Sequence, residues 1–301
     1  MHRGEHEADL PAEVEHIHTE RNQLVARRDE LASFSADAVI DLSAMTAADA
    51  ESLDAAIGPS VALVAASSAD VYRAFASMYE GTVTDAVPLT EGAPLRTDPP
   101  PDREVMPGWA YEVMHYEKLD VERIYLERGA TICRLPLVYG EHDYRRREEF
   151  VLSRVRAGRD RIPVGAATLL LSRAYAPELA RGLQLAAERG GRGEVFNLAE
   201  RDCATVHLWM REILAAAGHE AELVRVPEEL VPQDLGFTAE TPQPLLVDSS
   251  KAERELGWVH APWRECVAKS VRWHLANPPD GAPGFDADDA ALASPRRGDN
   301  R

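Results

Sequence analysis

Two hydroxyl side chains follow directly after a buried apolar run. Ser67 and Ser68 come after residues 61–66, Val-Ala-Leu-Val-Ala-Ala, a composition typical of a strand that is covered on both faces. In a doubly wound parallel sheet, ligands bind outside the carboxyl ends of the strands. A serine at this place can donate a hydrogen bond to a substrate oxygen, although serine is also a favoured N-cap of a helix.

A lysine and two tyrosines belong to a later segment, 111–128, whose pattern predicts a helix. Lys118 could hold the ribose of a cofactor and lower the pKa of a neighbouring acid, or it could lie on a solvated Glu–Lys face. Tyr111 precedes Lys118 by seven residues, on the same face but two turns away. Tyr116 precedes it by two residues, roughly 200° around a regular helix. Met114, one turn before the lysine, cannot donate a proton.

The elements that must position these residues alternate between strand and helix. Short runs rich in β-branched residues predict strands at 37–42, 61–66 and 130–135, and helical patterns predict helices at 47–57 and 111–128. This alternation is typical of βαβ units, and it predicts an α/β fold with a parallel sheet.

The charge balance argues against several classes of partner. The 301 residues include 33 Lys and Arg against 51 Asp and Glu, so the formal net charge is −18. Such a chain repels phosphate backbones and anionic lipid, and we expect neither nucleic acid nor membrane as a partner. Three scattered cysteines and the absence of a signal-peptide pattern predict a cytoplasmic protein with reduced thiols.

The order of four motifs resembles that of the extended short-chain dehydrogenase/reductase superfamily, in its NAD-dependent epimerase/dehydratase branch. The resemblance covers residues 1–277 and implies a Rossmann-type doubly wound parallel sheet with a smaller C-terminal substrate-binding region. The motifs are the serine pair before Val71-Tyr72, Lys118 with Glu122, Arg134 with Val138-Tyr139-Gly140, and the segment from Asp248 to Gly257.

The resemblance also implies roles for individual residues. Ser68 takes the position that contacts the substrate hydroxyl, and Lys118 takes the position that binds the ribose. Tyr116 and Tyr111 are the candidates for the catalytic acid. The implied cofactor is NAD or NADP, with NADP favoured because Arg3 lies where a cation can meet a ribose 2′-phosphate. The implied cofactor-binding residues are Arg3, Glu20, Arg21, Leu42, Ser43, Ala44, Ser67, Lys118, Pro136 and Val138.

Two departures from the family pattern concern the cofactor and the acid. The glycine-rich GxxGxxG turn, which holds pyrophosphate, is absent, and the sequence opens at what resembles the end of the second strand. Either the start is placed too late, which we favour because a sheet that begins mid-unit leaves apolar faces uncovered, or the chain lacks half of its cofactor site. We expect the chain as given to bind NAD(P) weakly or not at all. The second departure is Met114 in place of the family's tyrosine.

These observations predict three regions and two alternative functions. The regions are a truncated dinucleotide-binding part over 1–143, a mixed Rossmann and substrate-binding part over 144–277, and a disordered tail over 278–301. The first function is NAD(P)-dependent oxidoreduction, epimerisation or dehydration of a small hydroxylated, sugar-derived molecule. The alternative is a non-catalytic binding or scaffold protein with the same fold. A second copy of the chain is a candidate partner in either case.

Four histidines near the N-terminus are candidate metal ligands by residue type. They are His2, His6, His16 and His18. Their spacing matches no familiar metal motif, so we expect them on a solvated surface and expect no metal. The absence of a G-x-S-x-G elbow around the serine pair likewise argues against a serine hydrolase.

Overall fold

The chain forms two compact units in a computed structural model that describes residues 1–4, 10–97, 116–281 and 283–294. The first unit comprises Met1–Ser68, Asp98–Arg134 and Leu183–Phe196, and the second comprises Ala69–Thr97, Leu135–Gly182 and Asn197–Arg301. The boundaries differ from the predicted division at residue 143. The reason is that each unit is assembled from segments that are distant in the sequence.

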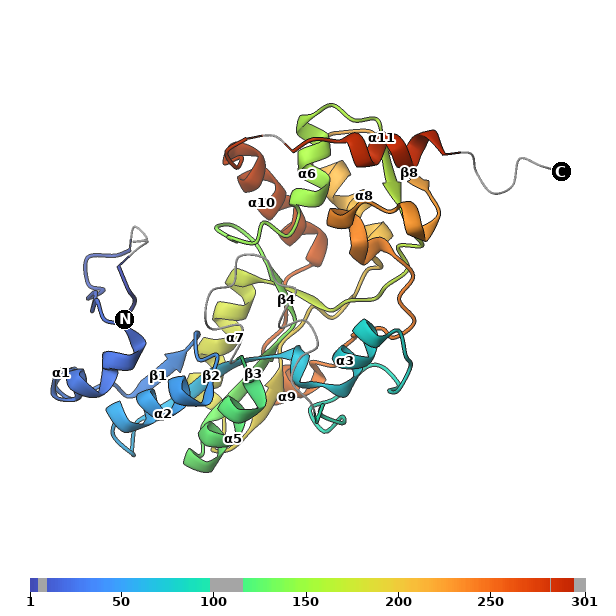
Figure 1. Cartoon of the computed structure of the whole chain (residues 1–301). Helices are drawn as coiled ribbons and strands as arrows, with labels where there is room; N and C mark the ends of the chain where they lie inside the picture. Colours follow the sequence, from blue (N-terminus) through green and yellow to red (C-terminus); the bar gives the residue numbers. More distant parts are fainter. Residues whose placement is uncertain (5–9, 98–115, 282, 295–301) are drawn as a thin grey trace. The chain divides into compact units, whose positions relative to one another are not determined.

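A four-stranded sheet forms the centre of the first unit (Figure 1). Its strands are β1 (Ala38–Asp41), β2 (Ala62–Ser68), β3 (Thr131–Leu135) and β7 (Val195–Asn197), in the order β1-β2-β3-β7. β1 and β2 run parallel, with Ala38 opposite Ala62 and Asp41 opposite Ala65. The α/β fold class with a parallel sheet is therefore confirmed.

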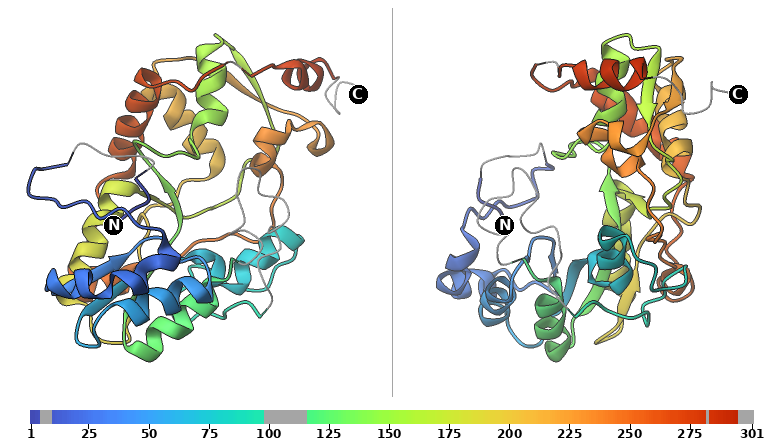
Figure 2. Two further views of the ribbon diagram at one scale, coloured as in Figure 1. Left: turned by 60° about the vertical axis from the view of Figure 1, so that its left-hand side comes forward. Right: turned by 45° about the vertical axis from the view of Figure 1, so that its right-hand side comes forward.

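Helices pack against this sheet through one apolar cluster (Figure 2). They are η1 (Arg21–Arg27), α1 (Arg28–Ser33), α2 (Ala47–Ala56) and α5 (Lys118–Arg128). Leu63 and Ala65, alternate residues of β2, share this buried cluster with Leu53 of α2 and Val121 of α5. The period of two along the strand thus decides which β2 side chains meet the helices.

A capping box fixes the loop between β1 and α2. The Thr46 hydroxyl accepts a hydrogen bond from the Asp49 N–H at 3.2 Å, and the Asp49 carboxylate accepts one from the Thr46 N–H at 3.0 Å. The same carboxylate accepts the Met45 N–H at 2.9 Å. The chain that leaves the carboxyl end of β1 is therefore held in one path.

The second unit has its own hydrophobic core, to which α6, α8 and α10 contribute Phe150, Trp209 and Val267. Its two small parallel sheets pair β4 with β6 and β5 with β8. The elements are η2 (Ala69–Val71), α3 (Arg73–Glu80), β4 (Leu137–Tyr139), α6 (Glu149–Arg156), β5 (Arg161–Val164), β6 (Arg173–Tyr175), α7 (Ala176–Arg189, which continues into the first unit), α8 (Val206–Ala216), β8 (Glu222–Arg225), η3 (Glu228–Leu230), η4 (Gln233–Thr238), α9 (Ser250–Leu256), α10 (Trp263–Ala276) and α11 (Asp286–Ala293).

Helix α11 corrects the prediction of a disordered tail. Its Asp288 is buried and accepts hydrogen bonds from Arg154 Nε at 2.7 Å and Nη2 at 2.6 Å. Arg154 also donates to Asp234 at 2.6 Å. The prediction is wrong for residues 286–293, because the composition of that segment gives no sign of the buried arginine that binds it.

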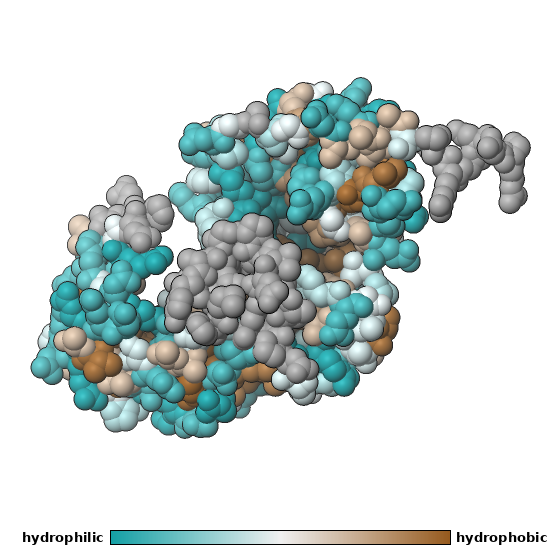
Figure 3. Space-filling model, in the orientation of Figure 1, coloured by the Kyte–Doolittle hydropathy of each residue, from teal (hydrophilic) through white to brown (hydrophobic). Residues whose placement is uncertain are grey.

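The face of the molecule seen in Figure 3 is largely polar, with small hydrophobic patches between the polar residues. Within the ranges that the structure describes, no helix combines the length and the apolar composition that crossing a membrane requires.

Candidate active site at the carboxyl ends of β1 and β2

Lys118 lies at the first position of α5 and is buried, with 5% of its surface exposed. Its ammonium group donates hydrogen bonds to the carbonyl oxygen of Ala44 at 2.5 Å and to that of Ala66 at 3.2 Å. Ala44 follows β1 and Ala66 lies near the end of β2. One cation therefore connects the carboxyl ends of both strands to the start of the helix.

The pairing between β1 and β2 ends just before Ala44 and Ala66. The last paired residues of β1 and β2 are Asp41 and Ala65, so Ala44 and Ala66 both lie beyond the pairing. Ala44 follows the end of β1, so its carbonyl needs a donor from outside the ladder. The ends of parallel strands are also where open α/β sheets bind ligands, and the sequence predicted Ala44 and Lys118 there.

Tyr116 lies beside Lys118 although the two residues are only two positions apart. The Lys118 Nζ atom is 6.0 Å from the centre of the Tyr116 ring, which is 9% exposed. Tyr116 precedes α5, because Glu117 is the extended N-cap and its side chain accepts the Leu119 N–H at 2.9 Å. Because Tyr116 lies outside the regular helix, helical geometry does not separate its side chain from that of Lys118. Tyr111 and Met114 lie outside the described residues.

The two serines of β2 differ in their surroundings. Ser67 is buried and donates to Glu122 at 2.5 Å. Glu122 in turn accepts two hydrogen bonds from Arg134, at 3.0 and 2.8 Å, in an ion pair that is almost fully buried. Ser67 thus belongs to a buried polar network with Glu122 and Arg134. Ser68, the last residue of β2, is half-buried and follows Ala66 by two residues.

Arg21 and Ser43, implied as cofactor-binding residues, lie in an ion-pair network at the end of β1. Arg21 donates to both carboxylate oxygens of Asp41, at 2.9 and 2.5 Å, and to the Ser43 hydroxyl at 3.0 Å. Asp41 also accepts from the Tyr125 hydroxyl. Burial opposes the ionisation of Asp41, but the hydrogen bonds and charge of Arg21 outweigh it and hold the pKa of that carboxyl below its usual value.

The other implied cofactor-binding residues are spread over both units. Glu20 and Leu42 are exposed, Leu42 by 63%. Arg3 is exposed beside the pairing of residue 2 with residue 18. Pro136 and Val138 belong to the second unit, between β3 and β4 and within β4.

Glu200, a buried acidic residue of the second unit, was not among the site residues predicted from the sequence. Glu200 accepts a hydrogen bond from the Tyr139 hydroxyl at 2.5 Å, and both residues are buried. Burial raises the pKa of Glu200, and burial with the nearby carboxylate raises the pKa of Tyr139. The charge of the nearby Arg173 guanidinium opposes both pKa shifts but does not cancel them. This guanidinium lies 4.7 Å from the centre of the Trp209 ring. Tyr139 and Glu200 are 61 positions apart in the sequence, so their contact leaves no local signal.

One hollow of the first unit lies at the other end of its sheet. It has a volume of about 120 Å³ and is lined by the amino-terminal ends of β2 and β3 with Arg128 and Arg192. It contains none of the residues implied as catalytic. The carboxyl ends of β1 and β2 are the candidate site, because the buried Lys118 ammonium lies there, 6.0 Å from the centre of the Tyr116 ring.

Comparisons with known proteins identify similar folds. No family model and no curated protein sequence matches the chain. Among solved structures, dTDP-glucose 4,6-dehydratase from Bacillus anthracis in complex with NAD is similar, with 14% identity over 87% of this chain and 80% of that one and a TM-score of 0.64. RMD from Pseudomonas aeruginosa complexed with NADPH has 16% identity over 89% and 88%, with a TM-score of 0.63.

A third similar structure is UDP-glucose 4-epimerase from Thermotoga maritima with UDP-glucose. It has 16% identity over 87% of this chain and 84% of that one, with a TM-score of 0.60. The first of these proteins is a dehydratase and the third is an epimerase, as in the branch that the sequence motifs resemble. Identities this low establish the fold alone. The chain thus has the Rossmann-type α/β fold that these enzymes share.

Proposed function

We propose that the chain uses a nicotinamide dinucleotide, NADP in preference to NAD, to oxidise or reduce, epimerise or dehydrate a small hydroxylated, sugar-derived substrate. The observation that carries the proposal is the buried Lys118 ammonium between the carbonyls of Ala44 and Ala66, with the Tyr116 ring 6.0 Å away. The NAD and NADPH bound in similarly folded proteins support it.

The residues at this place suit the nicotinamide end of such a cofactor. An ammonium group donates three hydrogen bonds and accepts none, which suits the hydroxyl oxygens of a ribose. Its positive charge also favours the ionised form of a neighbouring phenol, and it therefore lowers the barrier to proton transfer at Tyr116. The half-buried Ser68 at the end of β2 supplies a hydroxyl near the same strand end.

The chain's share of the reaction is to hold groups and to move a proton. The chemistry that a bound nicotinamide would supply is a hydride acceptor or donor for a substrate carbon. Lys118 holds the ribose and fixes its orientation. Tyr116 Oη accepts the proton of the substrate hydroxyl or gives it back, and Ser68 Oγ donates a hydrogen bond to the same substrate oxygen.

A second candidate function is a non-catalytic binding or scaffold protein. It is favoured by the intramolecular bonds of three residues that the family resemblance assigns to the cofactor. Arg21 and Ser43 are bound to each other and to Asp41, and Ser67 is bound to Glu122. A chain in which these groups bind one another keeps the fold without needing a cofactor.

A binding experiment separates the two candidates. NADPH and NADH are titrated by calorimetry to millimolar concentrations into the wild-type chain, Lys118→Met and Lys269→Met. Lys269 is exposed on α10 and serves as the matched control. The proposal expects at least a tenfold loss of affinity in Lys118→Met and none in Lys269→Met.

Two outcomes contradict the proposal in different ways. A wild-type chain that binds neither nucleotide favours the scaffold candidate. Binding that Lys118→Met leaves unchanged shows that the site lies elsewhere. Because Lys118 is buried, urea unfolding checks that the variant folds, and Lys118→Gln, which keeps a hydrogen-bond donor, replaces it if it does not.

A further inference from the structure

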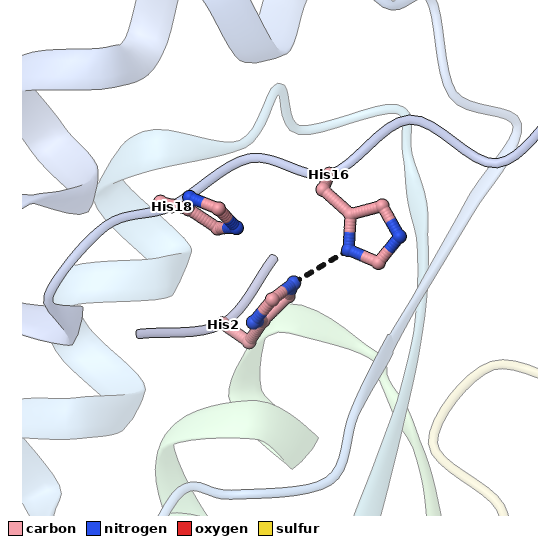
Figure 4. A group of neighbouring side chains, drawn as sticks. All are labelled: His2, His16 and His18. Atoms are coloured by element: carbon pink, nitrogen blue, oxygen red, sulfur yellow. Dashed lines mark hydrogen bonds between the residues drawn. The ribbon is translucent and has the colours of Figure 1, made fainter. Parts of the chain in front are cut away.

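Three of the four N-terminal histidines lie together in the first unit (Figure 4). The Nε2 atom of His2 is 2.7 Å from the Nδ1 atom of His16, and His18 completes the group. Each of the three offers one ring nitrogen, and these nitrogens all lie within 4.8 Å of one another. His16 and His18 are exposed, as the sequence predicted, but the prediction did not anticipate that the rings converge.

The backbone brings these side chains to one place. The His2 N–H donates to the Ile17 carbonyl at 3.1 Å, and the Thr19 N–H donates to the His2 carbonyl at 3.1 Å. These bonds form a parallel bridge in which His2 is the partner of His18. His16 and His18 are two residues apart in extended chain and point the same way, and paired residues share a face.

Gly4 contacts two of the three histidines, His2 and His18. Its φ of +83° is in the left-handed region, and a Cβ there would lie 3.3 Å from Cγ of His18. Its N–H donates to Nδ1 of His2 at 3.1 Å, which orients that ring with Nε2 toward His16. The turn after His2 thus allows the His18 ring to lie close over the backbone.

We propose that His2, His16 and His18 form a binding site for a divalent transition-metal ion of the zinc class. Zinc binds imidazole nitrogen at 2.0–2.1 Å in tetrahedral geometry, so its ligand nitrogens lie about 3.3 Å apart. That value falls between the 2.7 Å pair and the 4.8 Å limit of the group, so small ring rotations bring all three into range. Imidazole ligands suit zinc, nickel and copper rather than magnesium or calcium.

The proton balance of the site is simple. Neutral imidazole coordinates through the nitrogen that carries no proton. When Nε2 of His2 binds the ion, its proton moves to Nδ1 and the hydrogen bond from Gly4 is given up. Water fills the remaining position of the tetrahedron. The ion then links residues 2–4 to residues 16–18, and this site does not depend on the cofactor proposed above.

A metal titration tests the proposal. Tag-free protein is stripped with a chelator and titrated with Zn²⁺ by calorimetry, and Co²⁺ is added separately to record its visible absorption bands. We expect one ion per chain, and at least a tenfold weaker affinity in His16→Gln and in His18→Gln. His207→Gln, an exposed histidine of α8, is the matched control and leaves the affinity unchanged.

The same titration can overturn the proposal. If the wild-type chain takes up no stoichiometric Zn²⁺, the three rings are only a hydrogen-bonded group. If His16→Gln and His18→Gln bind as tightly as wild type, the ion sits elsewhere. Thermal unfolding of the metal-free variants is measured alongside, and unchanged midpoints show that a lost affinity reflects lost ligands, as expected for exposed side chains.

Discussion

The Lys118 ammonium lies 6.0 Å from the centre of the Tyr116 ring, with only Glu117 between the two residues in the chain. In a regular helix the two side chains would point roughly 200° apart. Glu117 prevents this, because its extended backbone (φ −154°, ψ 94°) places Tyr116 before the helix, and its N–H is bound to the Met45 carbonyl at 2.9 Å. A cation and a phenol can therefore meet without the four-residue spacing.

Tyr116→Phe tests this pair directly. The ring and its packing stay, while the proton donor is lost. We expect turnover with NADP(H) and a nucleotide sugar such as UDP-glucose to fall by about 10²–10⁴, which is the usual contribution of a positioned general acid. Nucleotide affinity should change little, since Lys118 remains.

Tyr144→Phe is the control for this experiment, because Tyr144 is 80% exposed in the second unit. Steady-state rates of both variants are compared with wild type. Equal rates for Tyr116→Phe and wild type would mean that another group supplies the proton.

Arg3 predicts the choice between the two nucleotides. Its exposed guanidinium is next to the backbone bridge of His2, and a cation there suits a 2′-phosphate. Arg3→Ala should weaken NADPH binding about tenfold and leave NADH binding unchanged. Arg201→Ala, an exposed arginine of the second unit, should affect neither. A wild-type chain that prefers NADH would contradict the prediction.

The Ser67–Glu122–Arg134 network predicts two different stability losses. Ser67→Ala removes one hydrogen bond to Glu122 and should reduce the free energy of unfolding by about 1–3 kcal/mol. Glu122→Gln leaves the buried Arg134 charge without its partner, and the loss should reach about 3–5 kcal/mol. Urea unfolding measures both, with exposed Ser60→Ala as control. Equal small losses would show that the network contributes little.

The strands and the serine pair could be predicted from the sequence because their signals are local. The apolar runs at 37–42 and 61–66 became β1 and β2, and the expected helix at 47–57 became α2. The carboxyl-end rule for parallel strands then drew attention to Ser67 and Ser68, the last two residues of β2. Each of these inferences needs only a period, a composition or a general property of parallel sheets.

The long-range contacts that bind Arg21 and Ser67 to other side chains could not be predicted from the sequence. Arg21 forms hydrogen bonds with Asp41, which is 20 positions later in the sequence, and Ser67 forms one with Glu122, which is 55 positions later. Their partners depend on how η1 and α5 pack on the sheet, and no periodicity encodes that. The start of α5 was also misplaced, since an extended Glu117 carries no composition signal. The histidine group likewise depends on a backbone bridge between residues 2 and 18.

Glu148 predicts a dependence of stability on pH. Its carboxyl is fully buried and accepts a hydrogen bond from Ser270 at 2.6 Å, and burial raises its pKa to about 7. In the unfolded chain the pKa is about 4.3, so between these values the native state holds a proton that the unfolded state has lost. By linkage, stability then falls as the pH rises through this window.

Glu148→Gln replaces the titrating carboxyl with an amide, so the free energy of unfolding should depend less on pH in this window. Relative to wild type, the variant should gain roughly 3 kcal/mol between pH 4 and pH 8, at about 1.4 kcal/mol per pKa unit. Urea unfolding at several pH values measures the gain, with exposed Glu220→Gln as control. Parallel curves for Glu148→Gln and wild type would show that Glu148 ionises normally in the folded chain.

A metal ion at His2, His16 and His18 predicts protection of the peptide bond after Arg3. That arginine is exposed, and it lies between His2 and Gly4, within the segment that the ion would hold. Trypsin needs the segment to detach, so the cleavage rate follows the detached population. An ion present at about 100 times its dissociation constant reduces that population about 100-fold. Mass spectrometry should therefore show a slowing of this order at Arg3 with Zn²⁺, no slowing in His18→Gln, and none after Arg201 in either protein. Equal protection in wild type and His18→Gln would assign the effect to an ion bound elsewhere.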